Sequence, residues 1–134
     1  MLEINPSEFE KYIEDGAKAR RSISIKEVTD VSKVLFDHPK EGGKLITFGN
    51  GDSTADAEHF AAELSGRFLR ERRPFPAIAL STNTTSFTAI GNDYDYSRVF
   101  SRQIEWVCTK NDYVVGISTS SNSPNVINGV RKAK

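Results

Sequence analysis

The side chains best suited to acid–base chemistry or metal binding in this sequence are His59 and Glu63. They stand four residues apart in a stretch with helical periodicity, so they share one helix face, and Asp56 lies near the same face. An imidazole and a carboxylate at this spacing can hold a divalent metal ion or exchange a proton with a substrate. Exposed pairs of this kind are also common on helix surfaces and contribute little there, and the spacing alone favours that simpler interpretation.

A second candidate is a run of six small polar residues, Ser118 to Ser123, which could bind an anion. The run follows an apolar segment and leads into a helix for which Ser123 is the predicted N-cap and Pro124 the first residue. The start of a helix offers free backbone N–H groups and a positive dipole end, which suit phosphate or carboxylate. A solvated linker is the alternative. The position after a strand, where ligands collect in open α/β sheets, favours binding.

A shorter loop, Gly49 to Ser53, joins another apolar run to a helix. Its glycines let the backbone approach an anion closely, and Ser53 could donate its hydroxyl or cap the helix. An ordinary strand-to-helix turn explains the loop equally well, since it has neither the three-glycine dinucleotide fingerprint nor the Gly-Lys-Ser/Thr ending of a P-loop. Asn92 and Asp93 follow the second strand region, where they could form a turn, cap a helix or bind sugar hydroxyls.

The pattern of apolar residues predicts the elements that position these groups. Strands that are apolar throughout alternate with amphipathic helices, which is typical of a parallel sheet covered on both faces in a three-layer α/β fold. We expect a single domain in which an N-terminal helical segment, 1–43, packs on an α/β domain, 44–134. Helices are predicted from Pro6 (with Asn5 as N-cap), over 24–35, over 57–68, from about 95 to 107 and from Pro124. Strands are predicted over 45–48, 76–80 and 112–117. Residues 38–43 and 81–85 are predicted to be loops.

The amino-acid composition excludes several classes of protein. The 134 residues include 18 acidic and 18 basic side chains, so bulk electrostatics gives no reason to expect binding to nucleic acid or membranes. The single cysteine, Cys108, excludes an internal disulfide, fits the cytoplasm and is predicted to pack in the core. No apolar run approaches the ~20 residues of a membrane span, and the first residues do not form a signal peptide. We therefore expect a cytoplasmic protein.

Taken together and in order, these segments resemble the sugar isomerase (SIS) family, and within it the branch that isomerises phosphorylated heptoses. The resemblance covers almost everything from Lys44 onward. It implies a flavodoxin-like αβα sheet with N-terminal helices. The matching stretches are Phe48–Ser53, Ala55–Phe68, Pro76–Leu80, Ala89–Asp93 and Gly116–Ser123.

The resemblance also implies a reaction and a site. The reaction is the aldose–ketose isomerisation of sedoheptulose 7-phosphate to D-glycero-D-manno-heptose 7-phosphate, by proton transfer through an enediol. His59 and Glu63 occupy zinc-ligand positions, and Glu63 also occupies the position of a proton-transfer group. A homodimer or homotetramer is implied, with sites shared between subunits. The implied phosphate ligands are Ser118, Thr119, Ser120 and Ser123 with help from Ser53, and the other implied substrate contacts are Asn50, Gly51, Asp52, Asn92 and Asp93.

The sequence departs from the family in three ways. The family has glycine at the positions of Asp52 and Ser121. A carboxylate in an anion-binding loop adds repulsion of about 1 kcal/mol or more at ~4 Å, and a side chain at Ser121 crowds the ligand or changes the loop. The family also continues for about two more strand–helix units of ~30 residues each, which carry a glutamine and a histidine of the site. We therefore expect a truncated fold with an uncovered sheet edge and an incomplete metal site.

Two alternatives to an isomerase remain. One is a non-catalytic SIS module that binds a sugar phosphate or a protein partner, in regulation or in replication initiation. The other is an assembly protein built from part of the fold, in which the sheet pairs with that of a second copy.

Overall fold

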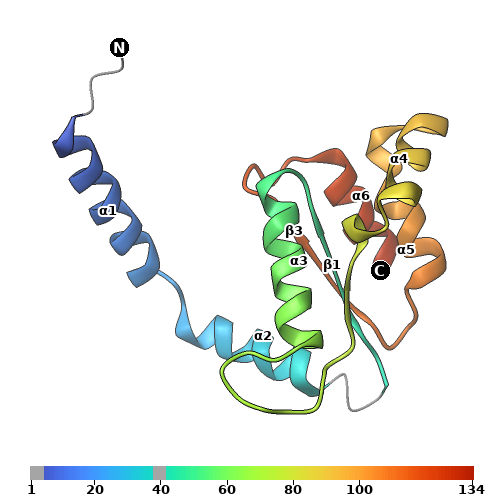
Figure 1. The fold of residues 1–134 in the computed structure, drawn as a ribbon, viewed down its shortest axis with the longest axis horizontal. Helices are drawn as coiled ribbons and strands as arrows, with labels where there is room; N and C mark the ends of the chain where they lie inside the picture. The colour runs from blue at the N-terminus through green and yellow to red at the C-terminus, as the bar shows by residue number, and fades with distance from the viewer. Residues whose placement is uncertain (1–4, 38–41) are drawn as a thin grey trace. The chain divides into compact units, whose positions relative to one another are not determined.

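The computed structural model describes residues 5–37 and 42–134 and divides into two compact units, residues 1–34 and 35–134. The first unit contains helix α1 (Pro6–Arg21) and most of helix α2 (Ile25–Asp37) (Figure 1). Asn5 caps α1, because its Oδ1 accepts the N–H of Ser7 over 3.1 Å, and Pro6 occupies the first turn. The predicted start of this helix is therefore confirmed, whereas most of the loop predicted at 38–43 lies outside the described residues.

The second unit is built on a three-stranded parallel sheet with the order β2-β1-β3. Its strands are β1 (Leu45–Gly49), β2 (Ala77–Ala79) and β3 (Tyr113–Ile117). Leu45 is in register with Ala77 on one side and with Tyr113 on the other, so β1 is the central strand. All five residues of β1 are buried, whereas the residues of the edge strand β3 are half-buried.

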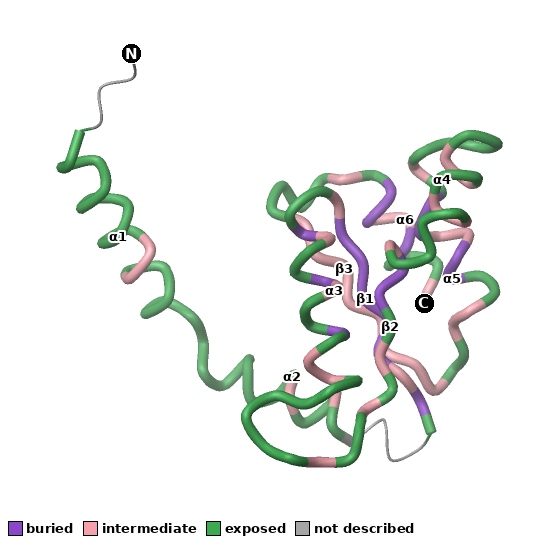
Figure 2. Tube along the Cα trace, in the orientation of Figure 1, coloured by how far each residue is buried: buried purple, intermediate pink, exposed green. Residues whose placement is uncertain are grey.

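Helices cover both faces of the sheet, as predicted for a three-layer fold. Helix α3 (Asp52–Ser65) lies on one face, and α4 (Thr84–Asp93), α5 (Ser101–Val107) and α6 (Pro124–Ala133) lie on the other side (Figure 1). The largest group of buried residues joins β1 to this second layer, as the purple segments of Figure 2 show. The buried hydrophobic cluster consists of Ile46, Phe48, Leu80, Val99, Phe100, Ile104 and Val126.

Helix α6 approaches β1 closely through glycine. A Cβ atom at Gly129 would lie 2.7 Å from Cζ of Phe48, and one at Gly116 would lie 2.9 Å from Val126 and 3.1 Å from Phe48. Phe48 in turn stacks on Phe100, with ring centroids 4.7 Å apart. The lack of side chains at these two positions therefore lets the aromatic pair fill the space between helix and strand.

The region between β2 and α5 differs from the sequence-based prediction. Residues 80–82 form a short 3-10 helix and the predicted loop then gives way to α4, which Asn83 caps by accepting the N–H of Ser86 over 3.1 Å. The helix predicted from about residue 95 is a 3-10 turn, Tyr96–Arg98, followed by α5. Helix α4 escaped prediction because its first turn is polar and few of its residues, among them Phe87 and Ile90, pack on the core.

No helix within 5–37 or 42–134 is both long and apolar enough to cross a bilayer.

An ion pair holds the N-terminal ends of β1 and β3 together. The carboxylate of Asp112 is 2% exposed and accepts hydrogen bonds from Nζ of Lys44 (2.6 Å) and from the backbone N–H groups of Lys44 (2.8 Å) and Thr109 (2.7 Å). Burial raises the pKa of this carboxyl, but the hydrogen bonds from Lys44 and Thr109 outweigh burial and bring its pKa below the ordinary value. The native structure therefore depends on the ionised form of Asp112.

We expect Asp112→Asn to lower the free energy of unfolding by about 2–4 kcal/mol, because the variant leaves the Lys44 ammonium without its anion. Because the folded-state pKa lies below the ordinary value of 3.8, this stabilisation is present above about pH 4 and disappears as the pH falls through the folded-state pKa. Denaturant unfolding at neutral pH and at about pH 3 measures both effects. The control is Glu105→Gln, which breaks the exposed pair with Lys132 and should change stability little; equal losses in the two variants would contradict the prediction.

Candidate active site

The loop after β1 is a tight turn that requires glycine. A Cβ atom at Gly49 would lie 2.6 Å from the carbonyl oxygen of Ser53, and Gly51 has a φ of +53°. The hydroxyl of Thr54 closes the turn by donating to the Gly49 carbonyl over 2.6 Å. Asp52 is exposed and is the first residue of α3, where a carboxylate interacts favourably with the helix dipole. The left-handed conformation therefore falls on Gly51, and the departure at Asp52 does not strain the backbone.

Ser53 lies inside the first turn of α3, and the N-cap residue is Gly51. The Ser53 residue is 6% exposed, and its hydroxyl makes no hydrogen bond within the described part of the chain. A buried hydroxyl without a partner is unusual in a folded protein, and a ligand or an ordered water commonly satisfies such a group. Of the two roles predicted for Ser53, donation of the hydroxyl fits this position and helix capping does not.

The loop after β3 brings three serine hydroxyls together. The Oγ atom of Ser118 lies 3.2 Å from that of Ser123 and 3.4 Å from that of Ser120, and the Ser120 and Ser123 atoms are 3.5 Å apart. Ser123 is the N-cap residue of α6 and Pro124 is the first helical residue, as predicted. The Ser123 hydroxyl makes no capping bond, so it stays within the cluster. Thr119 is exposed on the same loop.

Two asparagine side chains connect the loops. Nδ2 of Asn50 donates to Oδ1 of Asn125 over 2.9 Å, and Nδ2 of Asn125 donates back to Oδ1 of Asn50 over 2.7 Å. The hydroxyl of Tyr96 donates to the same Asn50 oxygen over 3.2 Å. A pocket of about 310 Å³ is lined by these three residues together with Ser123 and others. Sequence analysis missed Asn125 and Tyr96, because a single polar residue in the first turn of a helix is usually exposed.

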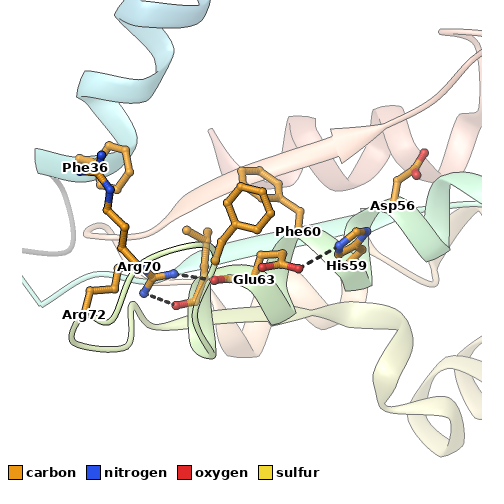
Figure 3. Close-up of a pocket in the computed structure, with 9 residues that line it drawn as sticks. Phe36, Asp56, His59, Phe60, Glu63, Arg70 and Arg72 are labelled. Carbon is orange, nitrogen blue, oxygen red and sulfur yellow. Dashed lines mark hydrogen bonds and ion pairs between the residues drawn. The ribbon is translucent and has the colours of Figure 1, made fainter.

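His59 and Glu63 form the predicted pair in the second half of α3. Nε2 of His59 lies 3.1 Å from Oε1 of Glu63, and the two side chains are 72% and 35% exposed. Figure 3 shows the Asp56 carboxylate turned away from this pair. The pocket that they line, of about 600 Å³, also contains Phe60, which the periodicity placed to one side. The remaining lining residues are Phe36, Leu64, Phe68, Arg70 and Arg72.

The C-terminal end of α3 is held by an arginine. The guanidinium of Arg72 donates to the carbonyl oxygens of Glu63 and Leu64 (Figure 3). It also lies 4.8 Å from the ring centroid of Phe75. A cation at this end satisfies terminal carbonyls and interacts favourably with the helix dipole. The backbone that carries Glu63 is therefore fixed, although its carboxylate is partly exposed.

The structure keeps the two groups of predicted site residues apart. Ser53 and Glu63 are ten residues apart on α3, so about 15 Å of helix axis separates them. The pocket of His59 and Glu63 contains no residue from the loop at 118–123. The described chain therefore presents a hydroxyl-rich site and a carboxylate–imidazole site that share one helix.

Asn92 and Asp93 lie at the C-terminal end of α4, one helix beyond the end of β2. The Asn92 side chain donates to Oδ1 of Asp93 over 2.9 Å. Asp93 lines a separate pocket of about 410 Å³ with Tyr94, Arg102, Trp106 and others. Because residues 84–93 form helix α4, which the sequence did not predict, Asn92 and Asp93 do not lie at the end of β2.

Within the part of the chain that the structure describes, His59 and Glu63 represent the metal site that the resemblance implies. Among the described residues, no group of three or more His, Cys, Asp or Glu side chains is placed to hold a metal ion. His59 and Glu63 supply two donors, whereas protein zinc sites use three or four protein ligands. Cys108 contributes none: it packs against the core as predicted, and burial raises the pKa of its thiol.

Comparison with known proteins identifies the class. The sequence pattern of the SIS domain family matches residues 8–134, and the chain belongs to this family. It is 54% identical over 124 residues to a probable phosphoheptose isomerase of Thermoplasma acidophilum, covering 92% of this chain and 68% of that protein. It is 52% identical over 111 residues to phosphoheptose isomerase of Aquifex aeolicus, covering 83% of this chain and 58% of that protein.

Solved structures agree with the sequence comparison. Phosphoheptose isomerase of Neisseria gonorrhoeae superposes with a TM-score of 0.83 at 38% identity, over 95% of this chain and 65% of that one. A phosphoheptose isomerase of Francisella tularensis superposes with a TM-score of 0.89 at 31% identity, over 95% and 68%. The chain is therefore a homologue of phosphoheptose isomerases that spans about two thirds or less of their length. The expected family and the α/β fold class are confirmed.

One departure from the family strains the backbone. Ser121 has a φ of +56°, the left-handed region that glycine enters freely and other residues enter at a cost of about 1–2 kcal/mol. The loop therefore keeps a glycine-like conformation with a serine in it.

We expect Ser121→Gly to raise the free energy of unfolding by roughly 0.5–1 kcal/mol. Glycine relieves the backbone strain of the folded state, and the greater conformational entropy that it gives the unfolded chain offsets part of this gain. The control is Asn122→Gly in the same loop, where the described backbone has no positive φ and glycine should destabilise. Denaturant unfolding measures both changes. A loss of stability in Ser121→Gly as large as that in the control would show that this conformation is not strained.

Proposed function

We propose that this chain belongs to an aldose–ketose isomerase that interconverts sedoheptulose 7-phosphate and D-glycero-D-manno-heptose 7-phosphate in the cytoplasm. The observation that carries the proposal is the hydroxyl cluster of Ser118, Ser120 and Ser123 at the start of α6, in a chain homologous to phosphoheptose isomerases. Hydroxyl donors at a helix N-terminus favour a phosphate group. Its single cysteine is compatible with the reducing cytoplasm.

The phosphate subsite consists of Ser118, Thr119, Ser120 and Ser123, with Ser53 on the facing loop. The three clustered hydroxyls can turn from each other toward phosphate oxygens without moving the backbone. The buried hydroxyl of Ser53 gains the partner that it lacks within the described chain.

Sugar hydroxyls would meet the loop after β1. Asn50 can donate an N–H, the backbone of Gly51 permits close approach, and the exposed carboxylate of Asp52 accepts from a hydroxyl. Asn92 and Asp93 line neither the pocket of Asn50 and Ser123 nor the pocket of His59 and Glu63. We therefore assign them to contacts with a substrate held by a second copy of the chain.

Glu63 is the proton-transfer group in this proposal. Isomerisation through an enediol moves one proton between C1 and C2 of the sugar and a second proton between the oxygens on these carbons. A carboxylate can accept the first proton from one carbon and return it to the other, while the second passes between the oxygens directly or through water. The phosphate on C7 lies at the opposite end of the extended substrate from these carbons. The separation of Glu63 from Ser53 along α3 therefore has the right sense, and its imidazole neighbour His59 can orient the carboxylate.

Zinc is the cofactor that the family resemblance implies. His59 and Glu63 are the two residues of this chain that would ligate it, and further donors would have to come from another segment or another subunit. Because two ligands do not make a zinc site, no step of the proposed reaction depends on the metal.

Exposed apolar side chains support assembly into a homodimer or homotetramer. In α1, Phe9, Tyr12 and Ile13 are 59%, 79% and 68% exposed, and in α2, Val28 and Val31 are 51% and 57% exposed. Apolar stripes of this size on amphipathic helices mark interaction surfaces. A second copy of the chain is the proposed partner.

A non-catalytic SIS module that binds a sugar phosphate is the second candidate. The observation that favours it is the incomplete set of metal ligands within the described residues. Turnover of sedoheptulose 7-phosphate separates the candidates, since a binding module produces no aldose.

If the isomerase proposal holds, Glu63→Gln should reduce kcat about 10²–10⁴-fold, because the amide cannot carry the proton. Substrate binding should persist, since the phosphate subsite is unchanged. A coupled assay of heptose 7-phosphate formation, with calorimetric binding of sedoheptulose 7-phosphate, measures both. Glu58→Gln on the same helix is the control, because Glu58 bonds Ser81 and lies outside this pocket. Parent-like turnover in Glu63→Gln would remove Glu63 from the mechanism.

We expect the protein to bind Zn²⁺ weakly and His59→Ala to reduce the affinity about tenfold or more, because one of its two donors is lost. Zinc titration by calorimetry at neutral pH makes the comparison. His38→Ala, which changes the other histidine of the sequence, is the matched control. Identical isotherms for the parent and His59→Ala would exclude this histidine as a ligand.

A further inference from the structure

The first turn of α6 contains an asparagine that the proposed phosphate chemistry leaves without a role. Asn125 is 2% exposed and lies beside the hydroxyl cluster without belonging to it. Its side chain makes both hydrogen bonds of a reciprocal amide pair with Asn50, a predicted substrate contact. A buried polar side chain in a small core carries a desolvation cost, so the contacts that it makes need an explanation.

The backbone fixes which way this amide pair points. The N–H of Val126 donates to Oδ1 of Asn125 over 3.0 Å. Because a backbone N–H can only donate, the atom that it meets must be the amide oxygen of Asn125. The Nδ2 group of Asn125 then faces Asn50, and the Asn50 atom that it meets must be an acceptor, Oδ1. The Tyr96 hydroxyl donates to the same oxygen and reinforces this orientation.

The pair therefore determines what Asn50 can offer a ligand. An amide oxygen accepts about two hydrogen bonds and an amide nitrogen donates two. Oδ1 of Asn50 already accepts from Asn125 and Tyr96, and its Nδ2 donates once to Asn125. Within residues 5–37 and 42–134, the second N–H of Asn50 has no acceptor. Asn50 thus has one free donor and no free acceptor beside the pocket that it shares with Ser123.

We infer that Asn125 is a positioning residue, which holds the Asn50 amide so that it donates one hydrogen bond to an oxygen of the substrate. That oxygen belongs either to the phosphate or to the sugar. The arrangement also sets specificity, because a ligand with an ammonium group at this place has no acceptor to offer. The identity of the substrate rests on the proposed function, whereas the orientation of the amide does not.

The test replaces Asn125 by an isosteric acceptor. In Asn125→Asp the new carboxylate can still accept from Val126 and from Asn50 but cannot donate to Asn50. One of the two reciprocal hydrogen bonds is lost and an oxygen faces the Asn50 oxygen, so the Asn50 amide is no longer held in one orientation. Asn128→Asp is the matched control: it is the same change one turn later in α6, where the side chain donates to the carbonyl oxygen of Ser97 over 3.1 Å. Thermal unfolding establishes that both variants fold.

Two ligand measurements distinguish the source of the oxygen. If it is a phosphate oxygen, Asn125→Asp raises the Kd for inorganic phosphate at least tenfold. If it is a sugar oxygen, that Kd stays within twofold of the parent and kcat/KM for sedoheptulose 7-phosphate falls at least tenfold. Either result supports the inference. Effects of Asn125→Asp no larger than those of Asn128→Asp, in both measurements, would overturn it.

A third measurement needs no catalysis. The side-chain NH₂ resonances of Asn50, assigned by their loss in Asn50→Asp, should move in Asn125→Asp and stay in place in Asn128→Asp. Unchanged Asn50 resonances in Asn125→Asp would refute the orienting role even if the parent is an active isomerase.

If the parent shows no turnover, the proposed function fails and this measurement still decides the role of Asn125. If Asn125→Asp does not fold, Tyr96→Phe removes one donor to Asn50 and should shift the same resonances; no shift would overturn the inference.

Discussion

The reciprocal hydrogen bonds between Asn50 and Asn125 are the interaction on which the geometry of the site depends. Adjacent parallel strands bring the loops after β1 and β3 to one edge of the sheet, but strand register does not fix how the loops meet beyond it. The amide pair fixes that meeting at 2.7 and 2.9 Å. It depends in turn on the close packing of α6 on Phe48, which the missing side chain of Gly129 permits. The core therefore holds the polar loops in place.

Helix α3 connects this edge of the sheet to the carboxylate that we propose as the proton carrier. Its first turn closes the loop after β1, and its last turns carry His59 and Glu63. A helix of this length is a rigid spacer, and Arg72 binds its final carbonyls. The distance between Ser53 and Glu63 is thus a property of the backbone. An extended substrate with its phosphate at one end and its reacting carbons at the other suits such a spacer.

The sequence predicted what depends on local pattern. The buried strand β1, the start of α6 and the pairing of His59 with Glu63 follow from hydrophobic runs, capping residues and helical spacing. Helix α4 was missed because propensity is weak in a polar first turn and tertiary contacts decide its conformation. Asn125 was missed because its partner is 75 residues away, and no local pattern reports such a pairing.

Asp52 and Ser121, at the two positions where the family resemblance implies glycine, differ in their physical consequences. At the first, Gly51 takes the positive φ, so Asp52 gains the helix dipole without strain. Its repulsion would act on an anion beside Ser53, whereas Ser118, Ser120 and Ser123 lie on the other loop. A carboxylate facing sugar hydroxyls accepts hydrogen bonds from them, so Asp52 is compatible with the sugar end of a substrate.

At the second position Ser121 itself takes the left-handed conformation, inside the proposed phosphate loop. The proposed phosphate loop therefore combines a strained residue with three hydroxyls that lie within hydrogen-bonding distance of one another.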